Sequence, residues 1–162
     1  MDAREAIATN PFFAEVLDDA EIAALARRAL AVERQAGTEL IHEDGSDTSL
    51  FIILDGRVEV IAGDTRHGRS VATLGPGEFF GEMSLLTGER RSATVRAVTD
   101  VKVLEITSLA IGPILDASPD LVDRFAAVLE RRQDELDHAY GNGALSLLDQ
   151  GGFAGLIRRF FG

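Results

Sequence analysis

The sequence predicts a mainly β fold with α-helices, in which an antiparallel β-roll of the jelly-roll-like barrel type is flanked by helices. From residue 37 to residue 106, apolar and polar residues alternate with a period of two, and glycine-containing turns follow one another closely. Residues 1–36 and 107–140 instead place apolar side chains at helical spacing. Short strands separated by close turns are typical of barrels and sandwiches, so we expect one roll with helical flanks.

The composition is that of a single soluble globular domain. The 162 residues are 46% hydrophobic and 27% charged and include no cysteine, which excludes disulfides and Cys-based metal or catalytic sites. No apolar run approaches the roughly 20 residues that span a bilayer, and no signal-peptide pattern is visible, so we expect a cytoplasmic location. The net charge of -11 argues against a nucleic-acid partner, which requires basic residues opposite its phosphates.

The N-terminal segment, residues 1–36, is expected to be helical. Asn10-Pro11 interrupts the first helix, and Asp18-Asp19 opens a second one in which Ile22 and Leu25 share a face. We expect this helical pair to cover one end of the roll.

The roll itself, residues 37–106, is expected to consist of short strands. Asp55-Gly56 predicts a tight turn between two of them, and residues 62–69 predict the tip of a hairpin. The expected strands are 39–42, 50–54, 57–61, 71–74, 93–98 and 101–106.

A segment inside the roll, residues 79–95, has the parts of a pocket for a small phosphorylated ligand. Gly81 removes side-chain bulk where a ligand can approach the backbone, and the carboxylate of Glu82 follows directly. Residues 83–86 predict one helical turn whose free N–H groups and dipole face an anion. Arg91 precedes a strand, so its guanidinium lies on a rigid element and can bind phosphate oxygens as a bidentate fork.

The order Phe-Gly-Glu-x-Ser-Leu and then Arg-Ser-Ala-Thr-Val within this segment resembles the phosphate-binding cassette of cyclic nucleotide-binding domains. That family includes the catabolite activator protein, the regulatory subunits of protein kinase A and cyclic-nucleotide-gated channels. The likeness covers about residues 10–138. It implies a non-enzymatic sensor that needs no cofactor and whose ligand is cAMP, with cGMP less favoured.

The resemblance assigns a role to each polar position of the cassette. The phosphate contacts would come from Arg91, Ser92, Ser84 and Met83. Glu82 would accept the proton of the ribose 2′-OH, and Gly81 would let the sugar lie against the backbone. In the alternative interpretation, without a ligand, Glu82 and Arg91 form a surface ion pair of little energetic value.

The purine is expected to meet apolar residues on facing strands and residues of a lid helix. By position in the family pattern these are Val60, Val71, Ala72, Leu136 and Asp137. The cAMP-binding transcription factors of the family place hydroxyl residues on that helix, so a leucine followed by an aspartate departs from their base recognition. The Ser92 hydroxyl could also reach a guanine amino group.

Residues 107–140 are expected to form two helices. Thr107-Ser108 caps a short helix, and Ser118-Pro119 begins a longer one with apolar residues at steps of three and four. The resemblance makes them the hinge helix and the lid helix, of which the lid closes over the purine. A plain packing helix would have the same pattern.

Residues 141–162 lie outside the resemblance and are expected to be a linker followed by a short amphipathic helix. Within residues 153–161 the apolar side chains fall at i, i+3, i+4, i+7 and i+8. This stripe fits docking on the domain or on a partner, a dimer contact, or a helix on a membrane surface.

Catalysis and metal binding are not expected from the sequence. The three histidines, His42, His67 and His138, lie far apart and show no ligand spacing, and neither a Ser/His/Asp pattern nor a P-loop is visible. A β-barrel enzyme or a structural module with a degenerate pocket is the alternative to a sensor.

The effector that such a sensor controls is inferred from the residues after the lid helix. No helix-turn-helix pattern is visible beyond Tyr140. The short, acidic chain is most similar to the cytoplasmic C-terminal domain of a bacterial cyclic-nucleotide-gated ion channel, whose membrane part would be its partner and source of oligomerisation. A stand-alone sensor that regulates a partner protein is the alternative.

Overall fold

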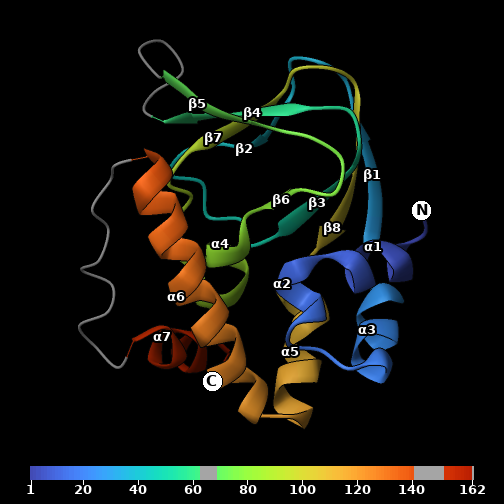
Figure 1. Cartoon of the computed structure of the whole chain (residues 1–162), viewed down its shortest axis with the longest axis vertical. Helices are drawn as coiled ribbons and strands as arrows, with labels where there is room; N and C mark the ends of the chain where they lie inside the picture. The colour runs from blue at the N-terminus through green and yellow to red at the C-terminus, as the bar shows by residue number, and fades with distance from the viewer. Residues whose placement is uncertain (63–68, 141–151, 162) are drawn as a thin grey trace.

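The computed structural model describes residues 1–62, 69–140 and 152–161, and Figure 1 shows their arrangement. The helices are α1 (Ala3–Thr9), α2 (Pro11–Ala14), α3 (Asp19–Ala26), α4 (Glu82–Thr87), α5 (Ser108–Ala117), α6 (Asp120–Tyr140) and α7 (Gly152–Phe161). The strands are β1 (Leu30–Arg34), β2 (Glu39–Ile41), β3 (Leu50–Asp55), β4 (Val58–Ala62), β5 (Arg69–Leu74), β6 (Phe79–Phe80), β7 (Thr94–Ala97) and β8 (Val101–Ile106). The tip of the expected hairpin, residues 63–68, lies outside the described residues.

The strands form two four-stranded sheets with the orders β1-β8-β3-β6 and β2-β7-β4-β5, and every pairing is antiparallel. The helices lie at the end of the roll that is lowest in Figure 1, with α6 rising beside α4. The predicted antiparallel β-roll with helical flanks is therefore confirmed. Within the described residues the two sheets face each other without closing into a barrel.

Strand β3 explains why one segment of the roll is apolar at consecutive positions. Leu50 and Ile52 pack in a cluster shared with the helices, whereas Phe51 and Ile53 pack in the cluster between the two sheets. Successive side chains of a strand point to opposite faces, so a strand that is covered on both faces needs apolar residues at each position.

The same division applies to the two aromatic residues of β6. The Phe80 ring stacks on Phe51 between the sheets, with ring centroids 5.3 Å apart. The Phe79 ring faces the helices and lies 5.6 Å from Phe12 of α2. The cassette therefore starts from a strand whose two side chains are anchored in two different cores.

The helical segment expected over residues 1–36 is too long. Helix α3 ends at Ala26, and Leu30–Arg34 form β1, which pairs with β8. The expectation failed because β1 exposes most of its side chains and so lacks a clear apolar alternation, while its pairing partner lies far along the chain. The expected start of α3 is confirmed, since the Asp18 side chain accepts from the Glu21 N–H in a capping box.

Helix α7 packs against the domain, which favours the docking interpretation of the C-terminal stripe. Ile157 is fully buried in the cluster that also contains residues of α4, α5 and α6. None of the helices in the described ranges combines the length and apolar character needed to cross a membrane.

Candidate functional site

Gly81 determines the backbone conformation at the start of α4 and how closely Arg91 approaches it. It adopts a left-handed conformation with φ of +95° and is the N-cap of α4. A Cβ atom at this position would lie 2.6 Å from the carbonyl oxygen of Ser49 and 2.8 Å from Nη1 of Arg91. Glycine is therefore required both for the backbone conformation and for the close approach of Arg91.

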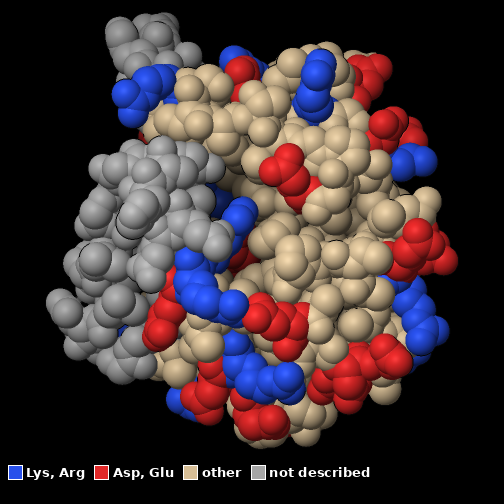
Figure 2. All heavy atoms as spheres, viewed as in Figure 1, with Lys and Arg blue, Asp and Glu red and all other residues tan. Residues whose placement is uncertain are grey.

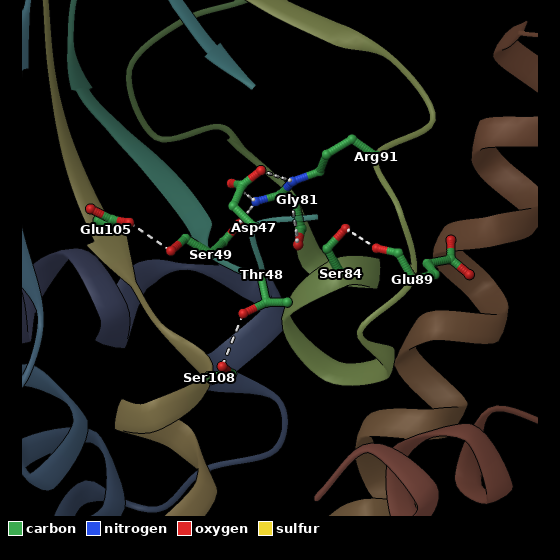
Figure 3. A network of polar contacts seen from close by, with 9 residues as sticks. All are labelled: Asp47, Thr48, Ser49, Gly81, Ser84, Glu89, Arg91, Glu105 and Ser108. Atoms are coloured by element: carbon green, nitrogen blue, oxygen red, sulfur yellow. Dashed lines mark hydrogen bonds and ion pairs between the residues drawn. The ribbon is translucent and has the colours of Figure 1, made fainter. Parts of the chain in front are cut away.

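The Arg91 side chain is buried, with 4% of the residue exposed, and its guanidinium has fixed partners. Nη2 donates to Oδ2 of Asp47 at 2.7 Å and to the carbonyl oxygen of Ser49 at 2.6 Å, and Nε donates to Oδ1 of Asp47 at 3.3 Å. Nη1 donates to the Gly81 carbonyl at 3.4 Å. These contacts hold the planar group in one orientation beside the start of α4 (Figure 3).

The backbone of Arg91 is paired as well. Its N–H donates to the Gly45 carbonyl at 3.0 Å, and its carbonyl accepts from the Asp44 N–H at 2.9 Å. The turn at residues 43–44 therefore places Asp47 next to the guanidinium.

The segment Asp47-Thr48-Ser49 links the cassette to two further elements, as Figure 3 shows. The Thr48 hydroxyl lies 3.0 Å from the hydroxyl of Ser108, the first residue of α5. The Ser49 hydroxyl donates to Oε2 of Glu105 on β8 at 2.6 Å. Sequence reasoning missed this segment, because contacts across such long chain separations leave no local pattern.

Glu82 is the second buried charge of the site, also 4% exposed, and its partner comes from α6. Oε1 accepts from Nε of Arg132 at 3.0 Å, and the Arg132 guanidinium carbon lies 4.6 Å from the centroid of the Phe79 ring. Since Glu82 pairs with Arg132 and Arg91 pairs with Asp47, the interpretation of Glu82 and Arg91 as an ion pair is wrong. Arg132 was not predicted as a site residue.

The remaining cassette residues differ in exposure. The buried Ser84 hydroxyl donates to the backbone carbonyl of Glu89 at 2.8 Å and so closes the loop after α4. Met83 is half-buried and Ser92 is exposed. Burial raises the pKa of the Glu89 carboxyl, since desolvation disfavours its charged form. Figure 3 shows this side chain directed towards α6.

The apolar strand positions expected near the purine lie on β4 and β5. Val60 pairs with Ala72 across these strands, and both pack with Val71 in the cluster between the sheets. The side chains of Leu136 and Asp137 lie outside the described part of the structure, although their backbone continues α6.

The face of the molecule seen in Figure 2 has a recess and carries charged side chains. Figure 2 shows the recess near the middle of this face, with blue and red side chains in it and beside it. A separate cleft of about 490 Å³ lies between α3 and α5 and is lined by none of the cassette residues. No group of acidic, histidine or cysteine side chains within the described ranges is arranged to hold a metal ion.

Comparison with known proteins identifies the family to which the domain belongs. The family model of the cyclic nucleotide-binding domain matches residues 31–118, more than half of the 162 residues. The chain belongs to this family. The matched range contains most of β1, the strands β2 to β8, residues 79–95 and α5, but neither α6 nor α7.

Relatives of this cyclic nucleotide-binding domain include channels and transcription factors. A cyclic nucleotide-gated potassium channel from Mesorhizobium japonicum is 33% identical over 127 residues, which cover 78% of this chain and 34% of the channel. The cAMP-activated global transcriptional regulator CRP of Escherichia coli is 33% identical over 112 residues, 68% of this chain and 52% of the regulator. The chain thus spans between a third and about half of the length of these relatives.

Among solved structures, the N-terminal domain of a transcriptional regulator from Streptomyces coelicolor superposes with a TM-score of 0.67 at 27% identity, covering 87% of this chain and 99% of that one. The regulatory domain of Toxoplasma gondii protein kinase A, solved with cAMP, gives a TM-score of 0.66 at 24% identity, covering 79% of this chain and 49% of the other. The second likeness is one of fold alone.

Proposed function

We propose that this domain is a non-enzymatic sensor that binds a 3′,5′-cyclic nucleotide, cAMP in preference to cGMP. The observation that carries the proposal is the pair of buried, oppositely charged residues next to Gly81, namely Glu82, which follows it in the chain, and Arg91, which donates to its carbonyl. Buried charges cost free energy unless they are well paired. A cyclic nucleotide would give both residues a role, because a cation can bind its phosphate and a carboxylate can accept a hydrogen bond from its ribose hydroxyl.

Arg91 is the proposed phosphate-binding residue, together with Met83, Ser84 and Ser92. The side chain of Asp47, its ion-pair partner, is half-exposed, so this carboxylate can turn to water when a phosphate takes up part of the guanidinium. The contacts of Arg91 with the Ser49 and Gly81 carbonyls keep the fork directed during that exchange. The first turn of α4 also leaves backbone N–H groups without partners inside the helix.

Glu82 is the proposed ribose-binding residue, with Gly81 allowing the sugar to lie close to the backbone. Its carboxylate accepts a hydrogen bond from Arg132 and has acceptor capacity left for a 2′-OH. Because Arg132 belongs to α6, the same carboxylate joins the ribose position to the proposed lid helix.

The base preference rests on the strand residues. Val60, Val71 and Ala72 present apolar surface, which accommodates adenine and offers no side-chain partner for the amino and carbonyl groups of guanine. Leu136 and Asp137 of the lid helix are proposed to complete the contact with the base.

Ligand binding would reach two helices through polar contacts of the cassette and its neighbours. Thr48 joins the Arg91 network to Ser108 at the start of α5, and Glu82 joins the cassette to Arg132 on α6. Nucleotide would shift the population of hinge and lid arrangements by no more than its difference in affinity for them.

The proposed setting is the cytoplasmic part of a bacterial ion channel. It is supported by the 33% identity to a cyclic nucleotide-gated potassium channel over 78% of this chain. The net charge of -11 speaks against DNA as the direct partner. A stand-alone sensor that acts on a partner protein is the second candidate, since α7 packs on the domain itself.

Isothermal titration with cAMP and, in parallel, cGMP tests the proposed function. We expect micromolar or tighter binding of cAMP, weaker binding of cGMP and an increase in Tm with the tighter ligand. If neither nucleotide gives heat or shifts Tm, the sensor proposal is wrong. The alternative, a structural module with a degenerate pocket, would then hold.

A further inference from the structure

Helix α7 lies beyond the residues that the family model matches, yet it is part of the core of the domain. Ile157 has 0% exposure and packs in one cluster with Leu85 and Leu86 of α4, and Leu129 of α6. A buried isoleucine between these helices binds α7 to both of them through apolar contact.

The contact between α7 and the cassette is made at the end of α4. Gly88 is the C-cap of α4, with φ of +71°. A Cβ atom on Gly88 would lie 2.4 Å from Cδ1 and 2.6 Å from Cε1 of the Phe160 ring. The ring therefore occupies the place that a side chain would take, and only glycine admits this approach.

The contacts with the other two helices are made by the neighbours of Phe160 in the last turn of α7. Nη2 of Arg158 donates to Oδ1 of Asp123 on α6 at 2.9 Å. A Cβ atom on Gly112 of α5 would lie 3.5 Å from the Phe161 ring, which is ordinary van der Waals contact. Three residues of one helical turn thus touch α6, α4 and α5, and Figure 1 shows α7 below α4 and beside the lower half of α6.

We propose that α7 is a strap that holds the lid helix α6 beside the cassette helix α4 and thereby slows the release of nucleotide. This inference rests on the proposed function, because it concerns the rate at which that ligand leaves. Helix α6 reaches the ribose position through Arg132, so an element that fixes α6 against α4 also fixes this cover. The effect of α7 on nucleotide release is set by the free energy with which it favours α6 lying beside α4 over α6 lying away from it.

The test measures association and dissociation rates of a fluorescent cAMP analogue with the full chain. Phe160→Ala should raise the dissociation rate about five- to tenfold and leave the association rate within about twofold, since allosteric couplings typically change affinity by at least about fivefold. Phe160→Leu, which keeps an apolar side chain on Gly88, should stay near the wild-type rate. Leu109→Ala, a truncation of an exposed apolar residue on α5, is the matched control.

Docking of α7 is followed without nucleotide in a Phe161→Trp background, because the chain contains no tryptophan. We expect blue-shifted emission that moves to the red when Ile157→Asp is added. Solvent-exposed emission before that addition would overturn the strap, and so would wild-type binding with an unchanged dissociation rate in Phe160→Ala. Failure of the wild type to bind any cyclic nucleotide would remove the proposed function, and the strap's role with it.

Discussion

Arg91 and Asp47 form a two-point contact in which Nε and Nη2 of the guanidinium donate to Oδ1 and Oδ2 of the carboxylate, at 3.3 and 2.7 Å. The arginine is buried and the aspartate is half-exposed. One partner is therefore fixed by the protein while the other can exchange with solvent or ligand. This asymmetry makes Arg91 the natural anchor of the proposed site.

Arg91→Ala should weaken cAMP binding by about 2–5 kcal/mol, because it removes a buried, charged hydrogen-bonding partner of the phosphate. The adjacent Arg90→Ala is the matched control, since Arg90 is exposed and carries the same charge. Titration calorimetry measures both, and melting of each variant shows that it is folded. Equal losses in the two variants would mean that net charge, not the cassette geometry, governs binding.

Glu82→Gln should reduce the preference for a ribose 2′-OH. We expect the wild type to bind cAMP more tightly than 2′-deoxy-cAMP by about 1.5–3 kcal/mol, the value of a hydrogen bond to a charged group, and the variant to lose most of that difference. Glu130→Gln, on the exposed face of α6, makes the same change in net charge and should keep the preference. An undiminished preference in Glu82→Gln would exclude this carboxylate from the sugar contact.

Gly88→Ala should destabilise the fold more than Gly77→Ala, although both glycines have positive φ. At Gly77 nothing lies within 4 Å of an added Cβ, so the cost is the left-handed conformation alone, about 1–2 kcal/mol. At Gly88 the collision with Phe160 should add about 1–3 kcal/mol. Urea unfolding measures the free energies of unfolding.

At Gly88 the cost of the left-handed conformation and the cost of the collision with Phe160 can be separated by repeating the comparison in a Phe160→Ala variant. In Phe160→Ala the ring is absent, so the extra cost of Gly88→Ala over Gly77→Ala should disappear. If the extra cost persists there, the cassette backbone itself is its source, and Phe160 does not lie on Gly88 in solution.

Glu89→Gln should stabilise the fold at neutral pH relative to the wild type. Because the folded-state pKa of this carboxyl is raised, the folded state binds the proton more tightly than the unfolded state. The stability that the protonated Glu89 carboxyl contributes is fully present below the pKa of this group in the unfolded state. It is lost as the pH rises through the pKa of the group in the folded state. The difference in Tm between variant and wild type should therefore grow from about pH 4 to neutral pH, whereas Glu130→Gln should show no such growth. A difference in Tm between Glu89→Gln and the wild type that does not change with pH would contradict the raised pKa of Glu89.

Most of the strands could be predicted from sequence because their determinants are local. Alternation and turn residues locate β4 and β8, and the apolar run before Asp55-Gly56 locates β3. The sequence also predicted that Gly81 and Arg91 lie together, and Nη1 of Arg91 donates to the Gly81 carbonyl. Likewise, the capping residues Asp18 and Thr107 mark the starts of α3 and α5. Each of these signals depends on neighbours within a few residues.

The partners of the buried charges were decided only by the tertiary structure. Asp47 reaches Arg91, and Arg132 reaches Glu82, across long chain separations that carry no periodic pattern. For the same reason β1 was missed, since its pairing with β8, not its own weak apolar alternation, makes it a strand. The apolar stripe of α7 was visible in the sequence, but its place on Gly88 was not, because complementarity between a ring and a bare backbone exists only once both are folded.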